Sequence, residues 1–249
     1  MITRRAALAC AGAGLALLPT PATAAAPLAA RPLDRLAEPW WRQRHADKRR
    51  DAQQRRIDLV LLGDSITQNL EREGPQPYLD FRPVWQRFFA PRNTLNLGFR
   101  GDATSHLLWR MRNGELANLK PKAAVILIGA NNMGRLRWPA ADSIEGIRAV
   151  VTEARARLPT TKLILMAVLP SARNPWVDET TATINRAIAT TPDVTWFDPT
   201  PLFIKNGQLD RTMFYDADLR PPEPLIHPTP AAMLAVYARM EPVLTRLMS

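Results

Sequence analysis

The chain has 249 residues, of which 46% are hydrophobic and 7% aromatic, as expected for a globular protein with one large core. Its single cysteine excludes an internal disulfide framework, and its three histidines argue against a zinc cluster. The formal charge of +10 favours acidic partners, but the arginines are spread out and accompany no binding motif, so no nucleic-acid partner is expected.

Residues 1–24 have the pattern of an export signal. Arg4 and Arg5 form a charged start, residues 6–18 are apolar but too short to span a bilayer, and residues 22–24 (Ala-Thr-Ala) suit cleavage. The start is similar to a twin-arginine signal peptide. We therefore expect an exported protein, secreted or in a bacterial periplasm, with no stable insertion into a membrane.

Residues 25–39 are rich in alanine and proline and predict a linker. Residues 40–56 form a highly charged helix, for which Trp40 and Trp41 are the expected anchors. No repeat or change of composition follows, so residues 40–249 are predicted to form a single domain.

From Ile57 onwards, short apolar runs alternate with helical patterns, which predicts an α/β fold whose parallel sheet is covered on both faces. Two helices are marked by apolar residues at steps of three and four, one over 144–158 and one from about Thr229. The expected strands are 57–62, 94–97, 123–128, 162–168 and 194–197.

Polar residues suited to chemistry follow several of these strands. Ser65 stands after Gly63-Asp64, where the first strand gives way to a helix. Residues 96–102 follow the second strand, residues 129–132 follow the third, and His227 precedes the last helix. The carboxyl ends of parallel strands line one crevice, so these residues are expected to meet there.

The residue types in this set suit ester hydrolysis by a serine. His227 can take the hydroxyl proton of Ser65, and the donors for an oxyanion would be the N–H of Ser65, the N–H of Gly98 and the carboxamide of Asn131. Taken singly, Ser65 also fits a helix cap and Asn131 a turn residue. Their order along the chain favours the catalytic interpretation.

Two neighbouring aspartates are assigned structural roles. Asp64 is expected to hydrogen-bond to nearby backbone in its turn, and Asp102 to cap the helix that begins near Thr104.

The motifs resemble those of the SGNH (or GDSL) hydrolases. Gly63-Asp64-Ser65 looks like the first block of that family, Gly98 the second, Gly129-Ala130-Asn131-Asn132 the third and His227 the histidine of the last. Within the family, the chain is similar to the catalytic subunits of platelet-activating-factor acetylhydrolase Ib, from roughly Trp40 to the C-terminus.

This resemblance implies a flavodoxin-like three-layer α/β/α sandwich with a five-stranded parallel sheet in the order 2-1-3-4-5. It also implies hydrolysis of short-chain esters, acetyl esters above all, through an acyl-serine intermediate and without a metal or other cofactor.

The chain departs from the family pattern in one place. The family usually ends in Asp-x-x-His, but Pro224 stands three residues before His227. Asp216 is the candidate triad acid, separated from the histidine by a proline-rich insert. Asp218, Glu223 and a Ser–His dyad steadied by a backbone carbonyl remain open.

Two other functions use the same fold: an O-acyltransferase acting on envelope sugars, and a binding module with impaired catalysis. The substrate is expected to be a small-molecule, carbohydrate or lipid ester. Its specificity is assigned to loops 133–139 and 172–178. The side chains there that suit an anionic or sugar-like ligand are Arg135, Arg137, Trp138, Arg173 and Trp176. The oligomeric state is left open.

Overall fold

The computed structural model describes residues 25–74, 79–219 and 221–249. Within these ranges, five parallel strands form one sheet in the order β2-β1-β3-β4-β5, as predicted. The segment expected to be an export signal lies outside the described residues. None of the helices in the described ranges has the length and apolar character needed to cross a membrane. The strands are β1 (Leu59–Gly63), β2 (Thr94–Gly98), β3 (Ala123–Leu127), β4 (Lys162–Met166) and β5 (Thr195–Phe197).

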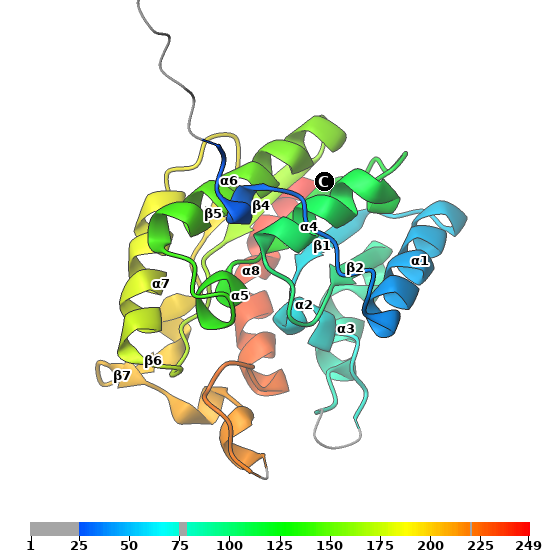
Figure 1. The fold of residues 1–249 in the computed structure, drawn as a ribbon. Helices are drawn as coiled ribbons and strands as arrows, with labels where there is room; N and C mark the ends of the chain where they lie inside the picture. The colour runs from blue at the N-terminus through cyan, green and yellow to red at the C-terminus, as the bar shows by residue number, and fades with distance from the viewer. Residues whose placement is uncertain (1–24, 75–78, 220) are drawn as a thin grey trace, which may run out of the picture.

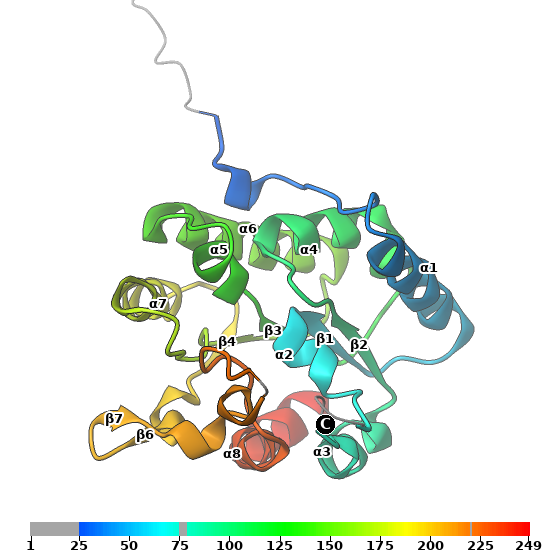
Figure 2. The same cartoon turned by 60° about the horizontal axis from the view of Figure 1, so that its bottom comes forward.

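The central strands are short and apolar because helices cover them on both sides. Every residue of β1, β2 and β3 is buried, which is typical of parallel strands inside an α/β domain. In β1, Val60 and Leu62 face one core, whereas Leu59 and Leu61 face the other. Figure 2 shows the resulting three layers, with the sheet between two groups of helices.

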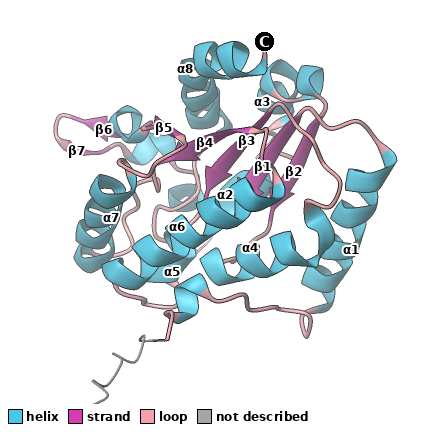
Figure 3. Cartoon of the chain, turned by 90° about the horizontal axis from the view of Figure 1, so that it is seen from above, coloured by secondary structure: helices cyan, strands magenta, loops and turns pink. Residues whose placement is uncertain are grey.

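One face of the sheet is covered by α4 (Thr104–Arg110), α6 (Ala140–Arg157) and α7 (Pro175–Ile188). The other face is covered by α3 (Arg82–Phe88) and α8 (Pro230–Met248) (Figure 1). The predicted stripe on α6 is buried through Ile147, Val151 and Ala154. Helix α1 (Pro39–Gln54) lies beside β2, at the edge of the sheet (Figure 3).

The remaining elements are short. Helix α2 (Ser65–Asn69) follows β1, and α5 (Ala130–Gly134) follows β3. A small hairpin of β6 (Ile204–Lys205) and β7 (Gln208–Leu209) lies outside the main sheet. Single turns occupy Leu28–Ala30, Ala90–Arg92, Met111–Glu115, Thr200–Phe203, Arg211–Met213 and Asp216–Asp218.

The segment 25–39, expected to be a linker, instead packs on the domain. Ala29 is fully buried, and its carbonyl accepts a hydrogen bond of 2.7 Å from the hydroxyl of Thr104. A Cβ added to Gly146 of α6 would meet the Ala29 carbonyl at 2.7 Å, so the two backbones are in close contact. Small residues on both sides allow this approach, and composition alone does not distinguish such a segment from a linker.

Candidate active site

Ser65 is the first residue of α2, directly after the turn that ends β1. The carboxylate of Asp64 caps this helix by accepting a 3.0 Å hydrogen bond from the N–H of Ile66, as expected for a supporting role in the turn. Ser65 as a whole is 9% exposed. Its hydroxyl is therefore held at the carboxyl edge of the sheet, where ligands of open α/β folds bind.

Ser65, His227 and Asp216 form a continuous hydrogen-bonded chain. Ser65 Oγ lies 3.0 Å from Nε2 of His227, and the Nδ1 of the same ring lies 2.7 Å from Oδ1 of Asp216. Because the Nδ1–H donates to the carboxylate, Nε2 of the neutral ring is left as an acceptor for the serine hydroxyl. The arrangement allows the imidazole to take the serine proton while the carboxylate stabilises the resulting positive charge.

The segment between Asp216 and His227 folds back on itself, which brings the carboxylate to the imidazole despite the longer spacing. Phe214 and Pro228 form an isolated β-bridge, and the N–H of Tyr215 donates to the carbonyl of His227 at 3.1 Å. The proline-rich insert returns where the N–H of Glu223 donates to the carbonyl of Asp216 at 3.1 Å. The insert thus extends the family spacing without separating the acid from the imidazole.

Asp216 is fully buried and strongly held. Its Oδ2 accepts hydrogen bonds from the N–H groups of Ile226 and His227, while Oδ1 contacts the imidazole. Asp218 is exposed, and neither it nor Glu223 is hydrogen-bonded to the ring of His227 within the described ranges. Of the four candidates that the sequence left open, Asp216 is therefore the one that contacts the histidine.

The ring of His227 is also positioned by an aromatic neighbour. It stacks on Tyr215 with ring centroids 5.7 Å apart and an interplanar angle of 18°. The hydroxyl of Tyr215 accepts a 2.9 Å hydrogen bond from the side chain of Asn69, at the end of α2. One helix thus carries Ser65 at its start and, at its end, anchors the tyrosine that supports the histidine.

The structure does not bring the N–H of Gly98 into the site. That N–H donates to Oδ1 of Asn96 at 2.8 Å, and a Cβ added to Gly98 would meet the backbone N of Gln68 at 2.2 Å. Gly98 is the last residue of β2 and pairs with Gly63, so it packs the sheet against α2. Its expected place in an oxyanion hole is therefore corrected.

Gly101, three residues later, lines the same hollow as Ser65, Asn131 and His227. Its φ of +76° is readily accessible to glycine. Over the part of the chain that the structure describes, no acceptor is recorded for the N–H of Gly101 or of Ser65. One N–H of the Asn131 carboxamide donates to the carbonyl of Asp102 at 3.0 Å, and its second N–H is left for a ligand. These three groups can stabilise an oxyanion.

A fully buried ionic cluster lies behind this loop. Arg110 donates to Oδ2 of Asp102 at 2.8 Å and also pairs with Glu115, and all three side chains have no exposed surface. The other carboxylate oxygen of Asp102 accepts from Arg35 at 2.7 Å and from the indole of Trp41 at 2.8 Å. Asp102 therefore does not cap the helix near Thr104, and its side chain holds the backbone that supports Asn131.

Burial also alters the titration of Asp64. Desolvation raises the pKa of this carboxyl to about 6, against the opposing effects of the Ile66 N–H and of His227. A carboxyl group next to the nucleophile thus changes its charge in mildly acidic solution.

The site opens into a hollow of about 620 Å³ that is rich in arginine. Ser65, Asn131 and His227 line it together with Trp40. The charged side chains that line it are Arg35, Glu38, Arg100, Arg135, Arg173 and Glu223.

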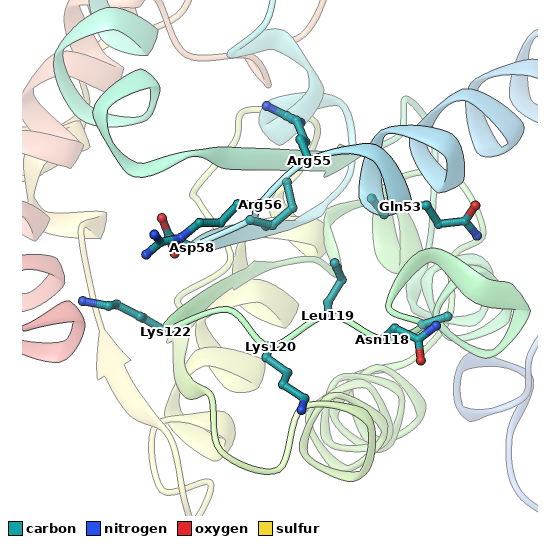
Figure 4. Close-up of a pocket in the computed structure, with 11 residues that line it drawn as sticks. Gln53, Arg55, Arg56, Asp58, Asn118, Leu119, Lys120 and Lys122 are labelled. Carbon is teal, nitrogen blue, oxygen red and sulfur yellow. Dashed lines mark hydrogen bonds and ion pairs between the residues drawn. The ribbon is translucent and has the colours of Figure 1, made fainter.

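A second hollow of about 670 Å³ lies at the opposite end of the sheet, before β1 and β3. Figure 4 shows that Arg55, Lys120 and Lys122 on its rim point in different directions. The Arg55 side chain donates to the carbonyl of Thr94, and Lys122 to that of Met248. No convergent set of polar groups is formed there. The described residues also include no group of three or more His, Cys, Asp or Glu side chains able to hold a metal ion.

Most of the chain matches one known protein family. Residues 61–235 match the model of the GDSL-like Lipase/Acylhydrolase family. The chain belongs to this family. It is therefore a hydrolase of the GDSL acylhydrolase type.

Two relatives show how far the similarity extends. The chain is 33% identical over 135 residues to the platelet-activating factor acetylhydrolase IB subunit alpha2 of Homo sapiens, a match that covers 54% of each protein. The chain thus matches about half the length of that relative. It is 29% identical over 182 residues to the subunit alpha1 of Bos taurus, covering 71% of this chain and 73% of that one.

Solved structures share the fold at lower identity. A GDSL-like lipase from Bacteroides thetaiotaomicron superposes with a TM-score of 0.61 and 19% identity, over 81% of this chain and 97% of that one. A carbohydrate esterase family 3 protein from Talaromyces cellulolyticus superposes with a TM-score of 0.56 and 18% identity, over 77% and 98%. At these identities, the likeness establishes the α/β fold alone.

Proposed function

We propose that this hydrolase is a serine esterase that cleaves short-chain esters, acetyl esters above all, through an acyl-serine intermediate. The observation that carries the proposal is the hydrogen-bonded chain from Ser65 Oγ through the His227 imidazole to the Asp216 carboxylate. The names of the alpha1 and alpha2 relatives, both acetylhydrolase subunits, support the choice of acyl group.

In the first half of the reaction, Ser65 Oγ attacks the ester carbonyl while its proton passes to Nε2 of His227. The carbonyl oxygen becomes an oxyanion held by the N–H of Ser65, the N–H of Gly101 and the Asn131 carboxamide. The intermediate then collapses: the bond to the alcohol oxygen breaks, and His227 returns its proton to that oxygen. The alcohol leaves, and the acyl group remains on Ser65.

In the second half, water takes the place of the alcohol. His227 removes a proton from the water as it attacks the acyl carbonyl, and then gives that proton to Ser65 Oγ as the acid departs. Asp216 stays ionised throughout and stabilises the imidazolium that forms twice in each cycle.

The test is turnover of p-nitrophenyl acetate by the purified protein and by its Ser65→Ala variant. We expect Ser65→Ala to lose nearly all activity while its circular dichroism spectrum and melting temperature remain close to those of the wild type. Comparable rates for the two proteins would contradict the proposal. A fluorophosphonate probe should label the wild type and fail to label Ser65→Ala.

The same experiment addresses the two alternatives. Transfer of acetyl to a sugar acceptor at the expense of acetate release would favour the O-acyltransferase. The binding-module hypothesis was motivated by the missing Asp-x-x-His spacing, and the contact between Asp216 and His227 removes that motive. Absence of fluorophosphonate labelling in folded wild-type protein would restore it.

We also propose that the protein is exported, on the pattern of residues 1–24. Fusing this segment to a reporter that is active only after export should direct it across a bacterial inner membrane. Replacing Arg4 and Arg5 by lysine should abolish that export if the twin-arginine route is used.

A further inference from the structure

Two arginines of the hollow lack a carboxylate within ion-pair distance among the described residues. Arg173, in the loop after β4, makes no ion pair or hydrogen bond there, and Arg135, just after α5, makes one hydrogen bond, of 3.1 Å, to the carbonyl of Gly101. Arg35 of the same hollow is different, since Glu38 and Asp102 both pair with it. Among the described residues, the hollow therefore contains positive charge that no ion pair neutralises.

Both guanidinium groups lie against the backbone that carries the oxyanion donors. A Cβ added to Gly134 would lie 1.6 Å from Nη1 of Arg173, so this side chain rests directly on the end of α5, whose second residue is Asn131. A Cβ added to Gly101 would lie 2.1 Å from Nη1 of Arg135. The two arginines thus lie against Gly134 and Gly101, on the two segments that carry the candidate donors Asn131 and Gly101.

The surroundings of Arg173 make its charge costly. The side chain is partly buried, and this desolvation, together with repulsion from Arg135, lowers the pKa of Arg173. Asp64 and Asp216 attract it, but neither is within ion-pair distance. Of the two carboxylates that line the hollow, Glu38 pairs with Arg35 and Glu223 belongs to an exposed residue. A partly desolvated cation of this kind is stabilised when an anion is bound beside it.

The chemistry of the side chain indicates the kind of anion. A guanidinium group presents a planar fork of N–H donors that matches the paired oxygens of a carboxylate or a phosphate. The hollow is also lined by the ring of Trp40, over which Arg35 lies at 5.2 Å and Arg100 at 5.1 Å, so further guanidinium groups stand next to an anion bound there.

We propose that the alcohol part of the substrate ester carries an anionic group, a carboxylate or a phosphate, which Arg173 binds with the assistance of Arg135. This inference rests on the proposed esterase function. The anion belongs to the alcohol part because an acetyl group has no atoms to carry it. Arg173 is accordingly a specificity-determining residue that contacts the substrate away from the bond that breaks.

The test compares two matched pairs of acetyl esters. One pair is 4-acetoxybenzoate and its methyl ester, and the other is 1-acetylglycerol 3-phosphate and 1-acetylglycerol. For each pair, the ratio of kcat/KM for the anionic and the neutral member is measured, after division by the rates of alkaline hydrolysis to remove differences in intrinsic reactivity. The pair with the larger ratio identifies the preferred anion.

We expect the wild type to favour the anionic member of at least one pair by tenfold or more at low ionic strength, mainly through KM, and to lose part of this preference in salt. Arg173→Gln should lower the ratio at least tenfold, whereas Arg173→Lys should retain part of it. Arg239→Gln is the matched control: it removes one positive charge from an exposed position on α8 and should leave the ratio unchanged.

A wild-type ratio near one for both pairs would overturn the inference while leaving the esterase function intact. So would equal ratios in the wild type and in Arg173→Gln. Failure of the proposed function looks different, because none of the four esters would then be cleaved in a Ser65-dependent manner.

Discussion

Replacing Asp216 by asparagine tests whether Asp216 is the acid of the triad, a role that the usual Asp-x-x-His spacing does not predict for it. The substitution keeps the size of the side chain, and the asparagine Oδ1 can still accept from the N–H groups of Ile226 and His227, as Oδ2 of Asp216 does now. The asparagine NH₂ group then faces Nδ1 of His227, which must become an acceptor. The ring proton moves to Nε2, and this nitrogen can no longer accept the proton of Ser65.

The expected loss in kcat is about 10⁴-fold, which is the effect of the wrong tautomer when the orienting aspartate of a serine protease is changed in this way. At about 1.36 kcal/mol for each factor of ten, this corresponds to about 5.5 kcal/mol of transition-state stabilisation. Folding should be affected little. Asp216→Ala would instead leave two backbone N–H groups unpaired, at a cost of about 1–3 kcal/mol for each group that remains buried.

Both variants are assayed with p-nitrophenyl acetate, alongside urea unfolding to measure stability. Asp218→Asn is the matched control, since Asp218 belongs to the same turn, is exposed and was a sequence candidate for the same role. It should keep kcat within about twofold of the wild type, as expected for a surface position. A loss below tenfold in Asp216→Asn, with Ser65→Ala inactive, would refute the reasoning.

Three further predictions follow from other parts of the site. Asn131→Ala should lower kcat by about 10²–10³-fold in the same assay, because one oxyanion donor is lost; an unchanged kcat would exclude that role. Arg110→Met should reduce the free energy of unfolding in urea by about 3–5 kcal/mol, because the buried carboxylates of Asp102 and Glu115 lose Arg110 and keep only Arg35 and His45 as ion-pair partners; a change below 1 kcal/mol would contradict it. The third concerns Asp64, whose pKa of about 6 in the folded protein exceeds the ordinary 3.8. The folded state therefore holds this proton more tightly than the unfolded chain. Stability should fall as pH rises from about 4 to about 6, by at most about 3 kcal/mol. Asp64→Asn should lack this decrease, and equal slopes for the two proteins would refute the assignment.

The positions of the strands and of Ser65, Asn131 and His227 follow from patterns that the sequence displays directly, whereas the strand order was implied by the family resemblance. Short apolar runs mark the strands, and Ser65 and Asn131 follow strand ends within a few residues. The acid is harder to locate because its place depends on the return path of a loop. Asp216 reaches His227 because the β-bridge between Phe214 and Pro228 closes the proline-rich segment. No local sequence pattern predicts that bridge.

The charges of the hollow were equally hard to interpret from sequence. Arg35 and Arg173 are the same residue type in two irregular segments, yet one has two carboxylate partners and the other has none in the described part of the chain. Pairing depends on segments distant in sequence: Asp102 lies 67 residues from Arg35. A cation available to a substrate is therefore recognised only once the neighbours of every arginine are known.

The glycine that we propose for the oxyanion hole is a further residue whose role the sequence alone does not reveal. Gly98 and Gly101 both follow the apolar part of the second strand, and nothing in their chemistry distinguishes the two N–H groups. The difference arises from Asn96, whose Oδ1 accepts the N–H of Gly98, and from the turn that gives Gly101 its positive φ. A sequence names the side chains that do chemistry, but a backbone donor is defined by having no acceptor, which is a property of the whole fold. For this reason the serine, the carboxamide and the imidazole could be located from sequence and the second amide could not.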